Sequence, residues 1–327
     1  MSRTVDAQVQ RAIEAAERAG RLVTADTPRG ATALRTRYKA GWLVSPAPGV
    51  FARPEYWQRL SRDEQDLHLI KTESHRHRGW VFAGVSAGLL HGLEIPFALR
   101  GRICVATSAR SHSSSSTRTQ RIRVSEDETV VVSGVPATSL VRTVFDCTRE
   151  ASLRLGLPVA DSALRALSKD PLAYGTSGEL RGLMEQVDLR FSGHRGIENT
   201  RRTLALADGR AESGGESVLR AALHELGFAA PELQVEVEDP VVPSRMLRID
   251  MGYLREDGSW LLIELDGVGK RGEGRDLGEL SRNRERIRES HLSLYGWPIM
   301  RVGWAELAND DLLAVLCNRY GVPRRGV

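Results

Sequence analysis

Three acidic residues interrupt a part of the sequence that is otherwise strongly apolar. Asp250, Glu264 and Asp266 stand close to isoleucine, leucine and methionine residues of the same segment. Clustered carboxylates repel one another and are costly to desolvate, so such a group persists most easily around a hard cation that takes oxygen ligands. A bound Mg²⁺ or Mn²⁺ would polarise a phosphate oxygen and lower the pKa of a bound water. These residue types therefore predict a magnesium site suited to cleavage of phosphodiester bonds.

Two strands joined by a turn have to position these acids. Residues 248–254 and 260–266 have strand-like composition, and the segment 255–259 between them contains an Asp-Gly pair typical of a hairpin turn. Side chains alternate between the two faces of a strand, so the loop length decides whether Asp250 lies opposite Glu264. A five-residue loop, or its three-residue core, places them opposite each other, whereas a two-residue turn does not. With an odd loop, the acids share one face of the hairpin.

Asp250, Glu264 and a further acid, Glu216, also have simpler explanations. Asp250 and Glu264 could form a solvent-exposed cross-strand pair, but opposed like charges destabilise a sheet by about 0.5 kcal/mol unless a cation intervenes. Asp266, two residues beyond Glu264, is expected on the same face. Glu216 lies three residues after Ser213, before a leucine-rich helical stripe that ends at residue 227, so helix capping explains it as well as metal binding does. The cross-strand cost favours the metal for the first two acids.

An ordered set of motifs between residues 213 and 307 resembles the PD-(D/E)XK nuclease superfamily, and more closely its small branch related to the very-short-patch-repair endonuclease. The motifs are ES at 216–217, Gln234, RID at 248–250, IELDG at 263–267, Lys270, ERIRE at 285–289, GW at 296–297 and MRVGWAEL at 300–307. The resemblance implies a restriction-endonuclease-like α/β/α domain with a mixed sheet. It also implies a DNA endonuclease that requires Mg²⁺ or Mn²⁺.

The resemblance assigns roles to individual residues. By it, the metal ligands are Asp250, Glu264 and Glu216, the further catalytic candidates are Asp266, Lys270 and Gln234, and the residues near the scissile strand are Arg288 and Arg301. One departure concerns the water-activating group: the superfamily has a lysine two residues after the glutamate, and this chain has Asp266 there. Lys270 is the candidate to replace that lysine. The alternative for the charges at 285–289 is the solvated face of a helix.

The N-terminal part of the chain concentrates positive charge. Between Asp26 and Glu55 there is no acid, and the bases there are Arg29, Arg35, Arg37, Lys39 and Arg53. A second stretch between residues 95 and 125 contains six arginines and no acid. Such stretches suit a polyanionic partner, and the alternative for each is a solvated basic surface.

The same region has the pattern of a winged helix-turn-helix. Helices are predicted at 5–19 and 31–40, followed by short strands at 42–44 and 50–52 around a Pro-Ala-Pro-Gly turn. The segment GWLVSPAPGVFARP at 41–54 resembles the wing of the N-terminal domain of AbiEi-type antitoxins. The likeness continues through SAGLLHGL at 86–93 and VPATSLVRTVFDCTRE at 135–150, and so covers most of residues 1–170.

This second resemblance implies a DNA-binding regulator. The second helix would enter the major groove, with Arg35, Arg37 and Lys39 at the DNA backbone or at base edges. The alternative is a protein-docking module, because the winged architecture serves that role too.

The middle of the chain has a mixed pattern. Strands are predicted at 103–106, 122–124 and 129–132, and helices at 139–150 and 157–167. His91 and Asp146 have no accompanying motif, so a structural role is expected for both. Residues 170–215 are rich in Gly, Ser and Arg, with one helix around 199–207, which is typical of an inter-domain connection.

We therefore expect a multidomain α/β protein. Its segments would be a winged helix-turn-helix at 1–60, a small α+β middle region with connector at 61–207, and a nuclease-like domain at 208–327. Cys104, Cys147 and Cys317 are far apart, without the spacing of a zinc module or a disulfide framework, which favours a reducing compartment. No signal-peptide pattern and no run of eighteen apolar residues is present, so we expect a cytoplasmic protein without a membrane partner.

Three functions fit these observations. The first is a metal-dependent DNA endonuclease targeted by the winged helix. The second is an antitoxin-type transcriptional regulator whose nuclease-like domain has lost cleavage and serves for binding or for assembly as a homodimer. The third, an RNA-directed nuclease, is disfavoured because aromatic residues make up only 6% of the chain and no stacking cluster is visible.

Overall fold

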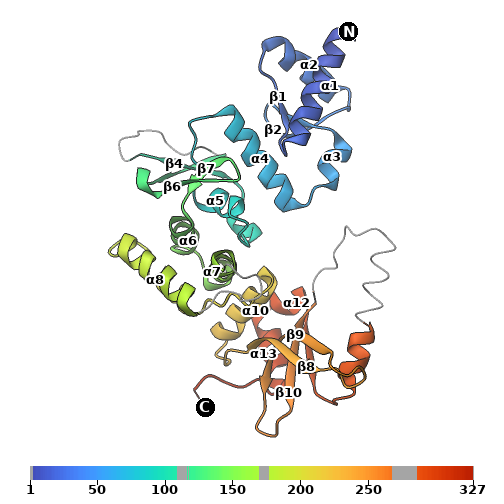
Figure 1. Cartoon of the computed structure of the whole chain (residues 1–327), viewed down its shortest axis with the longest axis vertical. Coiled ribbons are helices and arrows are strands. Elements are labelled where there is room, and N and C mark those ends of the chain that lie inside the picture. The colour runs from blue at the N-terminus through green and yellow to red at the C-terminus, as the bar shows by residue number, and fades with distance from the viewer. Residues whose placement is uncertain (1–2, 109–115, 117, 169–176, 267–285, 327) are drawn as a thin grey trace. The chain divides into compact units, whose positions relative to one another are not determined.

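Two units make up the chain in the computed structural model, which describes residues 3–108, 116, 118–168, 177–266 and 286–326 (Figure 1). Unit 1 contains residues 1–93 and 99–146, and unit 2 contains residues 94–98 and 147–327. The two units divide near residue 146, and the finer boundaries expected at 60 and 207 stay a prediction. Within the described residues no helix is both long and apolar enough to cross a bilayer.

Unit 1 begins with a small helical and β-structured region. Its elements are α1 (Arg3–Arg18), β1 (Val23–Thr24), α2 (Pro28–Lys39), β2 (Val44–Ala47) and β3 (Val50–Ala52). The strands form one sheet in the order β1-β3-β2. Helix α2 begins earlier than predicted because Thr27 caps it and Pro28 occupies its first turn. The first wing strand begins at Val44 rather than Trp42, whose side chain is 70% exposed.

The rest of unit 1 surrounds a second β-structured region. Its elements are α3 (Pro54–Arg59), α4 (Arg62–Arg76), α5 (Gly84–Leu90), β4 (Ile103–Thr107), β5 (Thr119–Arg123), the 3₁₀ turn η2 (Glu126–Glu128), β6 (Thr129–Val132), β7 (Val135–Thr138) and α6 (Leu140–Thr148). A further 3₁₀ turn, η1 (Phe97–Leu99), belongs mainly to the unit 2 residues 94–98. Strands β4 and β5 are parallel, β6 and β7 are antiparallel, and Phe82 bridges β4 to β7.

His91 and Asp146 have structural roles in unit 1, as expected. The Nε2 atom of His91 lies 2.8 Å from the carbonyl oxygen of Thr138. The buried Arg142 guanidinium donates to both Asp146 and Glu128, at 2.9 Å each. The first contact joins the end of α5 to β7, and the contact with Glu128 joins α6 to the residues 126–128.

Unit 2 begins with three helices, α7 (Leu153–Leu167), α8 (Ser177–Phe191) and α9 (Ile197–Ala205). Helices α7 and α9 match the helices predicted at 157–167 and around 199–207, whereas α8 lies in the part of 170–215 for which no helix was predicted. Val187, Phe191 and Leu204 are fully buried, so α8 and α9 belong to a core. Helix α8 was missed because glycine and serine residues bias a composition toward loops even where apolar residues keep helical spacing.

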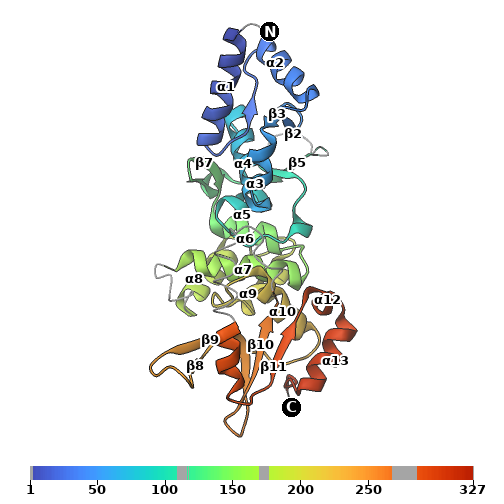
Figure 2. The same cartoon turned by 90° about the vertical axis from the view of Figure 1, so that its right-hand side faces the viewer.

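The last part of unit 2 is a sheet covered on both faces. Its elements are α10 (Gly214–Glu225), β8 (Glu232–Glu238), β9 (Met246–Leu254), β10 (Trp260–Leu265), the helical residues 286–293, β11 (Ile299–Val302), α12 (Trp304–Leu307) and α13 (Asp310–Tyr320). The strand order is β11-β10-β9-β8, with β10 and β11 parallel and the other pairs antiparallel, so the sheet is mixed as predicted (Figure 2).

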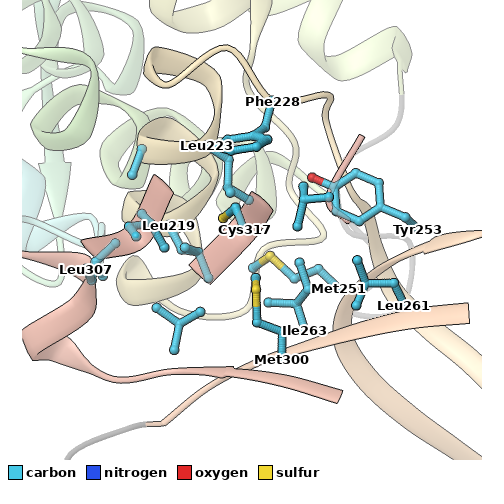
Figure 3. Close-up of a cluster of buried hydrophobic side chains, with 14 of the residues drawn as sticks. Leu219, Leu223, Phe228, Met251, Tyr253, Leu261, Ile263, Met300, Leu307 and Cys317 are labelled. Atoms are coloured by element: carbon cyan, nitrogen blue, oxygen red, sulfur yellow. The ribbon is translucent and has the colours of Figure 1, made fainter. Parts of the chain in front are cut away.

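Each face of this sheet has its own apolar cluster. On one face, Leu219 and Leu223 of α10 and Cys317 of α13 pack against Met251 and Ile263 (Figure 3). On the other face, Leu292 packs with residues of all four strands and with Tyr295 and Trp297. The helical residues 286–293 therefore cover the face opposite α10.

The hairpin that carries the acidic residues has the predicted register. Leu254 pairs with Trp260 and Met251 with Ile263, which leaves the five-residue loop 255–259. In this loop the backbone N–H of Arg255 donates to the carbonyl of Ser259 at 2.8 Å. Gly258 has a φ of +79°, a backbone conformation that favours glycine. The next position along the ladder sets Asp250 opposite Glu264.

A buried ion pair joins α10 to α7. The Arg220 guanidinium lies 2.6 Å from the fully buried Asp161 carboxylate, which also accepts from the backbone N–H of Asp208 at 2.8 Å. Burial raises the pKa of Asp161 to about 6, against the charge of Arg220, which lowers it. This contact fixes the helix that brings Glu216 to the sheet.

Replacing Arg220 by methionine should therefore destabilise unit 2. The change leaves the Asp161 carboxylate buried without its ion-pair partner, which should cost about 3 to 5 kcal/mol of unfolding free energy. Urea denaturation measures it, with Arg319→Met, at an exposed arginine of α13, as the matched control. Equal stabilities for the two variants would contradict the structural role of the pair.

Candidate functional site

Four polar side chains occupy one row across the sheet of unit 2. Glu264 pairs with Arg301 on the parallel strand β11. On its other side Glu264 stands opposite Asp250 of β9, one step beyond the pair Met251–Ile263. Gln234 of β8 stands opposite Asp250, because the flanking pairs join Leu233 to Met251 and Val235 to Ile249. The row therefore runs Gln234, Asp250, Glu264, Arg301.

The backbone of the row is irregular at Gln234, which has a φ of +54°. Leu233 and Met251 belong to the apolar cluster under α10, whereas Val235 and Ile249 belong to the cluster on the opposite face. Strands β8 and β9 therefore change the face to which their apolar side chains point, and the change falls at the polar row. A left-handed conformation in a residue other than glycine costs about 1 to 3 kcal/mol and is characteristic of functional positions.

Glu216 joins the row from the first turn of α10. Its carboxylate accepts from the Gln234 amide at 3.3 Å, from the Ser213 hydroxyl at 2.8 Å and from the backbone N–H of Glu212 at 2.9 Å. Ser213 in turn caps the backbone N–H of Glu216 at 3.2 Å. The capping explanation is therefore correct, and it is compatible with a second role because the same carboxylate contacts the row.

Burial and mutual repulsion shift the acids of the site. Burial raises the pKa of Glu216 to about 7, and the charge of Asp250 raises it further, against the hydrogen bond from Ser213. Burial also raises the pKa of Asp250, with the charge of Glu264 acting in the same direction. The backbone N–H of Leu265, which donates to Asp250 at 3.2 Å, opposes this rise. The charge of Asp250 thus raises the pKa of Glu216, and the charge of Glu264 raises the pKa of Asp250.

Two arginines neutralise Glu264, which is only 8% exposed. Arg288, from the helical residues 286–293, lies 2.6 Å from its carboxylate, and Arg301 lies 3.5 Å from it. Arg301 is closer to Glu289, at 2.6 Å. The resemblance had placed both arginines near the scissile strand. The pairing of Arg301 with Glu264 could not be predicted from the sequence, because it depends on the register of the parallel strands β10 and β11.

The donor chemistry of the row fits a hard divalent cation, since its acids and amide offer oxygen ligands only. Among the described residues, however, no group of three or more His, Cys, Asp or Glu side chains is arranged to hold a metal ion. The Glu264 carboxylate faces guanidinium groups instead. A metal bound here would have to displace at least one of them.

One of the expected catalytic residues, Asp266, lies apart from the row. Asp266 follows the last residue of β10 and is exposed, and its backbone N–H donates to the Val302 carbonyl at 2.9 Å. Its charge contributes to the raised pKa of Arg301, which owes most to the hydrogen bond with Glu289. Lys270 lies outside the described residues.

The second candidate site is the basic face of α2 in unit 1. Arg35 and Lys39 are exposed there, beside the exposed aromatic rings of Tyr38 and Trp42. Arg37 differs: it is buried, forms a salt bridge with Asp6 and donates to the Ala33 carbonyl at 2.9 Å. We therefore assign Arg37 to the structure of the helix pair and leave Arg35 and Lys39 as the candidates for DNA contact.

Comparison with known proteins gives limited likeness. No family model matches the chain. Two uncharacterized proteins of Mycobacterium tuberculosis, MT2308 and Rv2248, are each 31% identical over 122 residues, which is 37% of this chain and 41% of each relative. The match thus spans about two fifths of these relatives' length. A crystal structure of the RV2827C protein from the same species has a TM-score of 0.29 at 15% identity, covering 53% of this chain and 68% of that one.

The buried Glu216 makes stability depend on pH. Because its pKa is raised from 4.5 to about 7, the folded protein retains a proton that the unfolded chain has released, so stability falls as the pH rises through this window. The loss should reach about 3 kcal/mol at most.

Glu216→Gln should remove this contribution to the pH dependence and leave that of Asp161, whose pKa is raised to about 6. Urea denaturation at pH 4.5 and pH 7.5 measures it, with Glu256→Gln, an exposed residue of the same unit, as the control. A Glu216→Gln variant that loses as much stability as the native chain would show that this carboxyl is not the titrating group.

Proposed function

We propose that this protein is a metal-dependent DNA endonuclease of the PD-(D/E)XK type, with its hydrolytic site in unit 2 and an AbiEi-like winged helix-turn-helix at its N-terminus. The observation that carries the proposal is the row in which Asp250 and Glu264 lie opposite each other on neighbouring strands, with Glu216 beside them. Opposed buried acids are costly, and a divalent cation is the partner that offsets the cost and supplies chemistry.

The residues of the row divide the work of hydrolysis. Asp250 and Glu264 would hold the metal, with Glu216 as a further ligand. When bound, the metal would polarise a phosphate oxygen and lower the pKa of a bound water. Gln234, already hydrogen-bonded to Glu216, orients the water, and Arg288 and Arg301 bind the phosphate of the scissile strand. With positive charge available from these arginines, Asp266 in place of the usual lysine is compatible with cleavage.

A specific observation also favours the second candidate, an antitoxin-type regulator that binds DNA without cutting it. Glu264 is fully engaged by arginines, and the described acids do not converge as a metal site. In that case unit 2 would serve for binding or for assembly of a homodimer. Cys104, Cys147 and Cys317 are buried and form no disulfide within the described part of the chain, which fits a reducing, cytoplasmic location for either function.

Cleavage should depend on both opposed acids. Asp250→Asn and Glu264→Gln each remove a charged ligand, so the rate of plasmid nicking in Mg²⁺ or Mn²⁺ should fall by about 100-fold or more. Glu256→Gln, in the loop of the same hairpin, should nick normally, and a chelator should stop the native protein. DNA binding without nicking in any divalent metal would favour the regulator.

DNA affinity should depend on the exposed bases of α2 and not on Arg37. Arg35→Ala and Lys39→Ala each remove one phosphate contact, so the slope of log affinity against log salt should become shallower by about 0.9 for each. Fluorescence anisotropy with a labelled duplex measures this, with Arg18→Ala, an exposed residue of α1, as the control. Arg37→Met should instead lower the melting temperature; unchanged slopes for Arg35→Ala and Lys39→Ala would exclude this face.

A further inference from the structure

Arg288 occupies the position beside Glu264 that a metal ion would need. One of its terminal nitrogens lies 2.6 Å from the Glu264 carboxylate, and the other donates to the backbone carbonyl of Arg248 at 3.1 Å. Its side chain is 21% exposed, so the guanidinium lies between the buried acid and solvent. Arg288 is therefore the cation in closest contact with the site.

The acids of the row need such a counter-ion. Glu216 and Glu264 are buried and Asp250 is partly buried; the charge of Asp250 acts on Glu216, and that of Glu264 acts on Asp250. Burying like charges without a cation costs several kcal/mol for each. Arg301 cannot meet this need alone, because it is closer to Glu289 than to Glu264. Of the two arginines that contact Glu264, Arg288 is the nearer, at 2.6 Å against 3.5 Å.

The element that carries Arg288 is held in place independently of this contact. Leu292 is buried in the apolar cluster of the sheet. His291 lies 2.9 Å from the fully buried carboxylate of Asp239, which also accepts from the backbone N–H groups of Val241 and Val242. The long Arg288 side chain can thus leave Glu264 by rotation about its own bonds, with the backbone of 286–293 unmoved.

We propose that Arg288 is an exchangeable counter-ion, which neutralises Glu264 in the metal-free protein and is displaced by a divalent cation onto a phosphate of bound DNA. The inference rests on the proposed function and adds a regulatory property to it. A guanidinium that leaves a carboxylate needs another anion, and a phosphodiester is its natural partner. Metal binding releases Arg288 from Glu264, and a DNA phosphate then accepts the released guanidinium. Metal binding and DNA binding should therefore strengthen each other.

Manganese binding measured by electron paramagnetic resonance tests this exchange in the full chain. Arg288→Gln removes the competing cation, so the variant should bind Mn²⁺ about tenfold more tightly than the native protein in the absence of DNA. A short phosphorothioate duplex should raise the Mn²⁺ affinity of the native protein by a similar factor and leave that of Arg288→Gln almost unchanged. Arg319→Gln, an exposed arginine of α13, should behave as the native chain in both measurements.

Further variants separate this inference from the proposed function. If neither the native protein nor Arg288→Gln binds Mn²⁺ more tightly than Glu264→Gln does, the metal site itself is wrong. If Glu264→Gln loses Mn²⁺ but Arg288→Gln binds it no better than the native chain, the exchange is overturned and the nuclease proposal stands. Arg288→Lys keeps the positive charge but cannot donate to both Glu264 and the Arg248 carbonyl, so it should give an intermediate Mn²⁺ affinity. Melting curves of the variants show whether a change in Mn²⁺ affinity comes from misfolding.

Discussion

The energetics of unit 2 depend on how buried negative charge is neutralised at the polar row. Each acid there has a different solution: Glu264 has two arginines, Asp250 accepts a backbone N–H, and Glu216 retains a proton up to a pH of about 7. A carboxylate transferred from water into a protein interior without such compensation costs several kcal/mol. The row is therefore an expensive arrangement, and a role beyond stability is the simplest reason for a fold to contain it.

Buried negative charge is also neutralised in the two elements that position the residues of the site. Helix α10 brings Glu216 to the row, and Arg220 of the same helix pairs with the buried Asp161. The helical residues 286–293 bring Arg288, and His291 beside it pairs with the buried Asp239. Burial alone would raise the pKa of Asp239, but hydrogen bonds from His291 and two backbone N–H groups outweigh it and lower the pKa. Both supporting elements are thus fixed by ionic contacts separate from those at the row.

Local patterns in the sequence predicted the parts of the site that local geometry decides. The five-residue loop of the hairpin follows from turn chemistry and strand composition, and it sets Asp250 opposite Glu264. The neighbours of Glu264 from distant segments could not be predicted, because the register of parallel β10 and β11 and the reach of Arg288 depend on tertiary packing. The burial of Arg37 escaped prediction for the same reason, since its partner Asp6 lies on another helix.

These contacts bear on Asp266, which stands where the PD-(D/E)XK superfamily has a lysine. In the proposed nuclease, a positive charge near the scissile phosphate could come from any residue that reaches it, and not only from one two positions after the glutamate. Arg288 and Arg301 reach Glu264 from another helix and another strand, while Asp266 lies exposed beyond the end of β10. Arginine stays protonated at any physiological pH, so it cannot take up a proton from water as a neutral lysine can. These arginines suit the binding of phosphate, and activation of the water would fall to the metal and to Gln234 or Glu216.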